Sequence, residues 1–153
     1  MTMFTGDNSI NMDAKGRFVM PSKYRERLEQ LCANQLVVTI DTQVRCLLVY
    51  PRNEWEKIAE KIEALPSFQP GTIRIKRLIL GHAQELEIDS NGRILLPASL
   101  REYAFLEKKL VLLGQGKKFE LWDEAEWTKV RDGYLEVEAQ EGEMPQELMN
   151  IAL

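Results

Sequence analysis

Residues 12–21 read MDAKGRFVMP, and residues 88–97 read IDSNGRILLP. Both stretches have the pattern Asp-x-x-Gly-Arg, followed by three apolar residues and a proline. Aspartate and glycine are favoured at the first and fourth positions of a type I turn. Apolar residues alternate with polar ones before each turn, which is typical of a half-buried strand. Each stretch therefore predicts a strand, a tight turn and a second short strand.

The similarity between the two halves continues on both sides of these turns. Ile10 aligns with Leu86 before the turns, and Trp55 aligns with Trp127 after them, once a contraction of four residues in the second half is allowed. The aligned residues keep the same order throughout. We therefore interpret the chain as two copies of one unit.

Each copy is predicted to contain four short strands and a small helix, with a further helix after it. The second pair of strands in each copy is expected at residues 36–40 and 46–50, and at residues 109–113 and 119–122. Pro21 and Pro97 end the apolar triplets and can begin a helix, since a proline in the first helical turn has no hydrogen bond to lose. Strands this short cannot form a core alone. We therefore expect an α+β fold in which hairpins of the two copies interleave around one shared core.

The overall composition is ordinary for a globular chain, with 44% hydrophobic and 29% charged residues. The longest apolar runs are too short to span a bilayer. The first ten residues lack the basic and apolar segments of a secretory signal. We therefore expect a cytoplasmic protein without a membrane partner, in which Cys32 and Cys46 are reduced, half-buried thiols.

The net charge of −4 hides an uneven distribution along the chain. From Glu120 to the end there are ten acidic and two basic residues, whereas residues 1–119 hold 18 basic and 14 acidic ones. Residues 13–27 alone have a net charge of +3. Residues 74–77 hold three more basic side chains, which we interpret as the solvated face of a linker helix. An acidic chain can thus present a basic face to nucleic acid.

No enzyme is predicted from the remaining motifs. His82 is the single histidine and the two cysteines are far apart, so no zinc site is expected. The glycines of GQGKK at residues 114–118 are better explained by a hairpin turn than by a phosphate loop. Val111 and Lys118 stand where a phosphate loop requires glycine and serine or threonine. We therefore expect no catalytic residue, no metal, no cofactor and no small-molecule substrate.

The two Asp-x-x-Gly-Arg turns, each followed by an apolar triplet and proline, resemble the swapped-hairpin barrel of the AbrB/SpoVT family of transcription regulators. The tandem arrangement narrows the resemblance. GHAQELEIDSNGRILLP at residues 81–97 and VLLGQGKKFELWDEAEW at residues 111–127 are similar to the MraZ family, and the similarity covers nearly the whole chain.

This resemblance implies a tandem, pseudo-two-fold, swapped-hairpin β-barrel with short helices packed around it. It also implies a bacterial, nucleoid-associated regulator that binds double-stranded DNA as an octamer-like ring. Its sites would be repeated G-rich boxes upstream of the division and cell-wall gene cluster that encodes it. We expect a first unit over residues 5–53, a helical linker over 54–80, a second unit over 82–125, and a C-terminal helix and acidic tail over 126–153. Whether DNA binding represses or activates transcription is left open.

The resemblance and the basic charge together predict a set of DNA-contacting residues: Lys15, Arg17, Lys23, Arg25 and Arg93. Arginine can donate two hydrogen bonds to O6 and N7 of guanine in the major groove. Lysine positions a protein on phosphates without reading the sequence. The alternative for Arg17 and Arg93 is that they only form ion pairs with the turn aspartates.

The two copies differ in charge where they align. Lys15 aligns with Asn91 and Lys23 with Ser99, so residues 89–103 are neutral overall. We therefore expect the first copy to be the stronger anchor on DNA, with the second mainly completing the fold. Since one small basic patch binds weakly, several chains would need to engage DNA together. The rival interpretation is a ring-forming interaction scaffold without a DNA partner.

Overall fold

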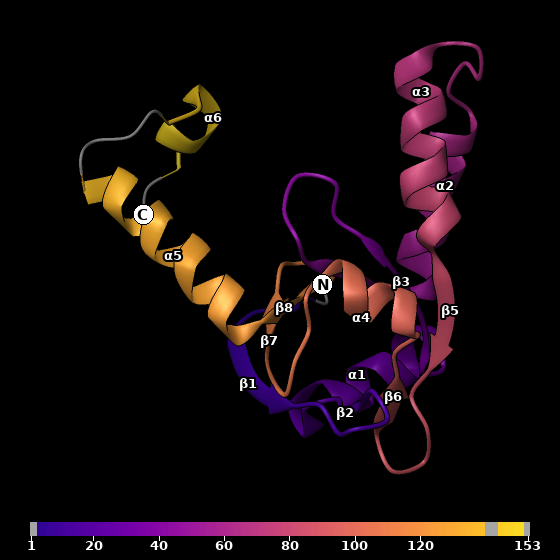
Figure 1. Ribbon diagram of the computed structural model, residues 1–153. Coiled ribbons are helices and arrows are strands. Elements are labelled where there is room, and N and C mark those ends of the chain that lie inside the picture. The colour runs from indigo at the N-terminus through magenta and orange to yellow at the C-terminus, as the bar shows by residue number, and fades with distance from the viewer. Residues whose placement is uncertain (1–2, 140–143, 152–153) are drawn as a thin grey trace.

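The two copies produce the same order of strands and helices in the computed structural model, which describes residues 3–139 and 144–151 (Figure 1). The first copy contains β1 (Asp7–Asn11), β2 (Arg17–Val19), α1 (Ser22–Cys32), β3 (Gln35–Ile40), β4 (Leu47–Pro51) and α2 (Arg52–Glu63). The second contains β5 (Gln84–Glu87), β6 (Arg93–Leu95), α4 (Ala98–Tyr103), β7 (Lys109–Gly114), β8 (Phe119–Asp123) and α5 (Glu124–Ala139). Helix α3 (Pro70–Ile75) and the π-helix η1 (Lys76–Leu80) join the copies, and α6 (Gln146–Met149) comes last.

Each strand of the first copy pairs with a strand of the second. Strand β1 pairs with β7, β2 with β6, β3 with β5 and β4 with β8, and all these pairs are antiparallel. The main sheet has six strands in the order β1-β7-β8-β4-β3-β5, while β2 and β6 form a separate two-stranded ribbon. The predicted α+β class is confirmed. The predicted barrel is not confirmed, because the three-residue strands β2 and β6 pair with each other and the six-stranded sheet is not closed.

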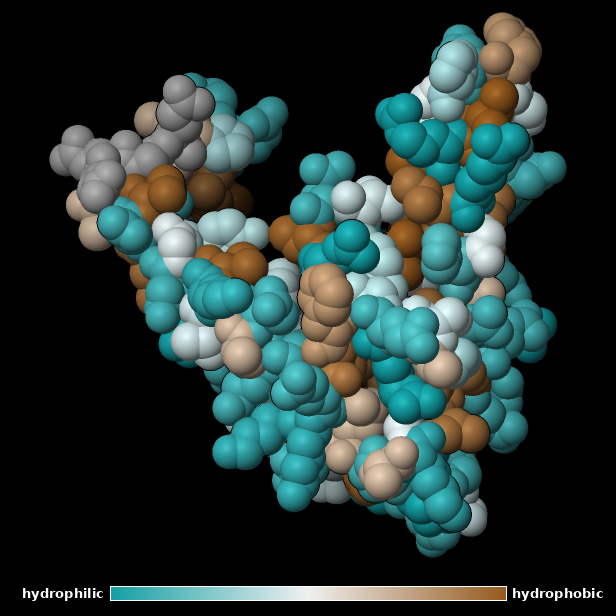
Figure 2. Space-filling view, in the orientation of Figure 1, coloured by the Kyte–Doolittle hydropathy of each residue, from teal (hydrophilic) through white to brown (hydrophobic). Residues whose placement is uncertain are grey.

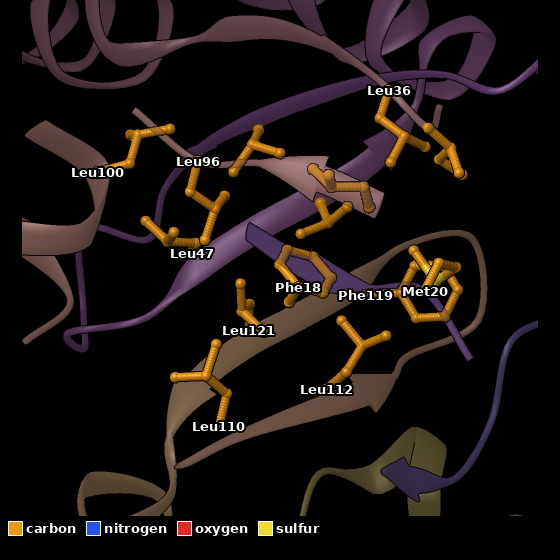
Figure 3. Packing of buried hydrophobic residues seen from close by; sticks show 14 of the residues in the cluster. Phe18, Met20, Leu36, Leu47, Leu96, Leu100, Leu110, Leu112, Phe119 and Leu121 are labelled. Carbon is orange, nitrogen blue, oxygen red and sulfur yellow. The ribbon is translucent and has the colours of Figure 1, made fainter. Parts of the chain in front are cut away.

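Both copies contribute to a single main core. Phe18 of β2 lies opposite Ile94 of β6, and both side chains are buried. Their neighbours Val19 and Leu95 lie on the other face of the ribbon and are 44% and 56% exposed. Figure 3 shows leucines of β3, β4, β7 and β8 arranged around Phe18 in this core. This alternation puts one face of the ribbon inward and leaves the other free.

Helices α2, α3 and η1 form an arm that projects from the body (Figure 1). These three helices contain no buried residue. The Lys76 ammonium group donates hydrogen bonds to the carbonyl oxygens of Glu63 (3.1 Å) and Leu65 (3.2 Å) and to the Ser67 hydroxyl (2.8 Å). Lys76 therefore closes the tip of the arm, whereas Arg74 and Arg77 are exposed, as expected for the solvated face of this helix. Among the described residues, no helix is long and apolar enough to cross a membrane.

Candidate nucleic-acid interface

The two Asp-x-x-Gly-Arg turns have matching hydrogen bonds. In the first turn, one carboxylate oxygen of Asp13 accepts the backbone N–H groups of Lys15 (3.0 Å) and Arg17 (2.9 Å). The other oxygen accepts Nε of Arg17 at 2.8 Å. Gly16 closes the turn by donating its N–H to the Asp13 carbonyl, with a φ of 87° that favours glycine. The turn aspartate thus fixes both the backbone and the arginine that follows.

The second turn repeats this arrangement with Asp89, Asn91, Gly92 and Arg93. Asp89 accepts the N–H groups of Asn91 and Arg93, both at 2.8 Å, and Nε of Arg93 at 3.1 Å. Gly92 donates to the Asp89 carbonyl and has a φ of 78°. The ion pair that the sequence offered as an alternative role is therefore present in both turns. In each pair only Nε of the arginine bonds to the aspartate.

Both turn aspartates are held in the ionised form. The backbone N–H of Arg17 is the main cause that lowers the pKa of Asp13, and that of Arg93 lowers the pKa of Asp89. A lowered pKa means that the carboxylate's contribution to folding is complete above its ordinary value of 3.8 and is lost only as the pH falls through the lowered value. The turns therefore keep their geometry at neutral pH.

The ribbon brings the two turn arginines onto one face. In the register of β2 and β6, Arg17 lies opposite Leu95, and Arg93 lies opposite Val19. The side chains of Arg17 and Arg93 are 33% and 39% exposed, and both line a pocket of about 280 Å³ together with Lys108. Within the described part of the chain, no hydrogen bond involves the terminal Nη atoms of either arginine. The four Nη atoms of the two arginines are thus available as donors on the outer face of the ribbon.

Lys108 was missed by sequence reasoning. It lies in the loop before β7 and reaches the first turn because its carbonyl oxygen accepts the N–H of Met12 at 2.8 Å. This contact joins residues far apart in the chain, and no local pattern signals it. Lys108 adds a third cation to the pocket that contains the two arginines.

The other predicted contacts are distributed differently. Lys15 is exposed in the first turn, next to Arg17. Lys23 lies at the start of α1, where its ammonium group is 5.1 Å from the centre of the Tyr24 ring and close to Gly6. Lys23 does not line the pocket of Arg17 and Arg93. Lys15 is thus close to Arg17 in the first turn, whereas Lys23 lies toward the N-terminal segment.

Arg25 holds the turn of the opposite copy. Its Nε donates to the Met20 carbonyl at 2.9 Å, and its guanidinium group lies so close to Gly92 that a Cβ there would be 2.3 Å from Cζ of Arg25. The Met20 N–H also donates to the Gly92 carbonyl at 2.8 Å. Contact of Arg25 with DNA remains a prediction, while its packing against the second turn is a structural role that the sequence did not reveal.

Arg101 makes the reciprocal contact in the second copy. Its Nε donates to the Leu96 carbonyl at 3.1 Å, and a Cβ at Gly16 would lie 2.7 Å from that nitrogen. The Leu96 N–H donates to the Gly16 carbonyl at 2.9 Å. Each turn is therefore supported by an arginine and a strand end that belong to the other copy.

Gly92→Ala is expected to destabilise the protein by about 1–3 kcal/mol. Most of this cost is strain at a positive φ, and the methyl group also displaces the flexible end of the Arg25 side chain. Chemical denaturation at fixed protein concentration measures the loss. Gly133→Ala is the control: a Cβ there meets no atom within 4 Å, and alanine in a helix is about 0.5–1 kcal/mol more stable than glycine. Equal midpoints for Gly92→Ala and the parent protein would contradict both the positive φ of Gly92 and its contact with Arg25.

One further cluster within residues 3–139 and 144–151 joins Asp41, Cys46 and Glu120, whose potential ligand atoms lie within 4.8 Å of one another. Burial raises the pKa of the Cys46 thiol and of the Glu120 carboxyl. Asp41 accepts backbone N–H groups of the β3–β4 turn, and Glu120 accepts the Trp122 indole N–H at 3.0 Å. These groups therefore stabilise the local turn and strand. Both cysteines are free thiols, and Cys46 is fully buried.

Comparison with known proteins gives consistent results along the whole chain. The family model for "MraZ protein" matches twice, at residues 3–78 and 79–146. A protein named "Transcriptional regulator MraZ" from Halorhodospira halophila is 54% identical over 152 residues, which cover 99% of this chain and all of that protein. Proteins of the same name from Saccharophagus degradans and Pseudomonas putida (strain GB-1) are 51% and 50% identical, again over 99% of this chain and their whole length.

Proposed function

Because this chain belongs to the MraZ family, we propose that it is a DNA-binding transcriptional regulator that reads DNA with the outer face of the β2–β6 ribbon. The observation that carries the proposal is the pairing of Arg17 and Arg93 on that face. A two-stranded antiparallel ribbon fits into the major groove of B-DNA. Each arginine is fixed at Nε by its turn aspartate and keeps its terminal nitrogens for O6 and N7 of guanine. The expected sites are therefore G-rich.

The cations around the ribbon would position it on the phosphates. Lys108 lines the pocket of the two arginines, and Lys15 lies in the same turn as Arg17. Lys23 and Arg25 would reach phosphates from two different sides of α1, outside that pocket. A protein that neutralises about three phosphates has a salt slope of only about −2.7 and binds weakly as a single copy. We therefore propose a ring of octamer-like size that engages successive repeated boxes, because simultaneous contacts convert weak affinity into avidity.

The finer expectations from the resemblance belong to the same proposal. The interleaved pairing of strands from the two copies supports a swapped-hairpin arrangement of the AbrB/SpoVT type. The expected operator is a set of direct repeats upstream of the division and cell-wall genes with which this chain is encoded. The expected location is the cytoplasm, in association with the nucleoid.

A fluorescence-anisotropy titration tests this function. The probes are the DNA upstream of the protein's own gene and a scrambled DNA of equal length, each titrated at several salt concentrations. We expect tighter binding to the upstream DNA and a steep loss of affinity with salt. Light scattering is expected to give a mass several times the 17.7 kDa of one chain. An assembled protein that shows neither sequence preference nor salt dependence would instead support the scaffold without a DNA partner.

A further inference from the structure

We propose that helix α5 of one copy docks its outer half into an apolar groove on the arm of a second copy. The inference rests on the proposed assembly and names the surfaces that would form it. It begins from a stripe along α5, which we call the α5 stripe: Trp127, Val130, Tyr134 and Val137. These residues follow one another at helical spacing and therefore share one face of the helix.

The first half of the α5 stripe packs against the body. Trp127 and Val130 contact the small cluster of Cys46, Val111, Leu113 and Trp122, and the rings of Trp122 and Trp127 are 5.3 Å apart. The second half extends past the body, where Tyr134 is 56% and Val137 is 55% exposed. Figure 1 shows α5 leaving the body in a direction away from the sheet. The inner half of the α5 stripe is thus covered by its own chain, and the outer half is left exposed.

The arm has an apolar groove with a basic rim. The groove, of about 620 Å³, is lined by Pro70, Ile73 and Leu78, and by Arg74 and Arg77. We call this the arm groove. The space-filling view in Figure 2 shows apolar side chains exposed on the arm and on α5. A groove of this size accommodates the side chains of one or two helical turns.

The charges of the two surfaces are complementary. Residues 70–80 hold Arg74, Lys76 and Arg77 and no acidic residue, and only Lys76 is occupied by the loop at the tip of the arm. Arg74 and Arg77 form no ion pair with any described residue. On α5, Glu138 follows Tyr134 by one helical turn and therefore flanks the stripe. An acidic flank beside a Tyr–Val face matches an apolar groove with an arginine rim.

The two surfaces lie on different sides of one chain. Figure 1 shows α5 and the arm leaving the body on opposite sides, so α5 is not placed to fill the groove of its own copy. The α5 stripe and the arm groove are also different surfaces, so a contact between them is head-to-tail. Head-to-tail contacts repeat from copy to copy and close into a ring when the rotation allows. A second copy of this chain is thus the occupant that fits the groove.

Mixing two defective proteins tests the docking. The groove variant is Ile73→Asp with Arg77→Asp, and the stripe variant is Tyr134→Asp with Val137→Asp. Each variant loses one of the two surfaces but keeps the other, so each alone is expected to fall from the assembled mass to that of a single 17.7 kDa chain. An equimolar mixture has one intact pair of surfaces and is expected to form a dimer and nothing larger. Sedimentation velocity at high protein concentration gives the masses, and circular dichroism checks the fold.

Leu135→Asp is the matched control. Leu135 is on the same turn of α5 and is 60% exposed, but it lies off the stripe, so this variant is expected to assemble like the parent protein. Rings that persist in both double variants would overturn the docking while leaving the proposed assembly intact. Single chains that do not dimerise on mixing, or a Leu135→Asp variant as defective as the stripe variant, would also overturn it. A parent protein that is itself a single chain would remove the proposed assembly as well, whatever its affinity for DNA.

Discussion

Arg17→Ala is expected to lower the affinity for the proposed G-rich operator by about 1–3 kcal/mol for each engaged copy, and so to abolish detectable binding by the proposed assembly. The change removes two Nη donors that stand free on the outer face of the β2–β6 ribbon. It also removes the ion pair with Asp13, but the carboxylate keeps the backbone N–H groups that shape the turn. We therefore expect the fold and the assembly to persist while the preference for guanine is lost.

Arg93→Ala and Lys15→Ala are the two variants with which Arg17→Ala is compared. Arg93 has the same bonds to its turn as Arg17, but Asn91 stands where the first copy has Lys15. We expect Arg93→Ala to weaken operator binding less than Arg17→Ala. Lys15→Ala is expected to weaken binding to operator and scrambled DNA alike, and to flatten the salt slope by about one unit for each phosphate that is no longer neutralised.

Anisotropy titrations of the three variants on operator and scrambled DNA, with the assembled mass checked in each, measure these effects. If Arg93→Ala proves as damaging as Arg17→Ala in an intact assembly, both copies read DNA equally. The two arginines share one face and one pocket, so the comparison of these two variants tests directly whether the copies contribute equally. The larger expected effect of Arg17→Ala rests on the charge of the neighbouring residue, because Lys15 in the first copy aligns with the neutral Asn91 in the second.

Phe18→Ala is expected to destabilise the fold by about 3–5 kcal/mol. Phe18 is 2% exposed and lies opposite Ile94, where β2 and β6 close over the shared core. Removing its ring leaves a cavity between the two copies, and both strands of the ribbon are too short to move into it. Urea denaturation at fixed protein concentration gives the change in the free energy of unfolding.

Val19→Ala is the control for this prediction, since Val19 is the next residue of the same strand but is 44% exposed. Its truncation is expected to change the free energy of unfolding by no more than about 0.5 kcal/mol. Similar losses for Phe18→Ala and Val19→Ala would show that the ribbon does not keep its inward and outward faces in solution.

The strands could be predicted because their signals are local. The turn pattern placed Asp13 and Gly16 correctly, and the apolar runs at residues 36–40 and 109–113 correspond to β3 and β7. Such features depend on residues that are close in the chain. The open sheet could not be predicted in the same way, because closure depends on which partner the short strands β2 and β6 choose. They pair with each other, and only tertiary structure decides that choice.

The candidate interface shows the same limit. Arg17 and Arg93 could be selected from their motifs, but their position on one face follows from the register of β2 and β6. Lys108 has no motif and reaches the pocket through a contact with Met12. The packing of Arg25 against Gly92 was equally hidden, since α1 and the second turn belong to different copies. Charge pattern indicated a basic region, and the long-range pairing determined which cations meet.

Each turn is supported by an arginine from the other copy, and this contact links the evolution of the two halves of the gene. Arg25 fills the space above Gly92, and Arg101 fills the space above Gly16, so each half sets the permitted size of a residue in the other. A duplicated segment usually lets one copy drift while the other preserves function. Here neither half can drift alone at these positions, because a side chain gained in one turn meets an arginine encoded by the opposite half. Arg25 and Arg101 are therefore expected to be kept together with the glycine that each one covers, and a half expressed alone would have to find a second molecule to supply the missing arginine.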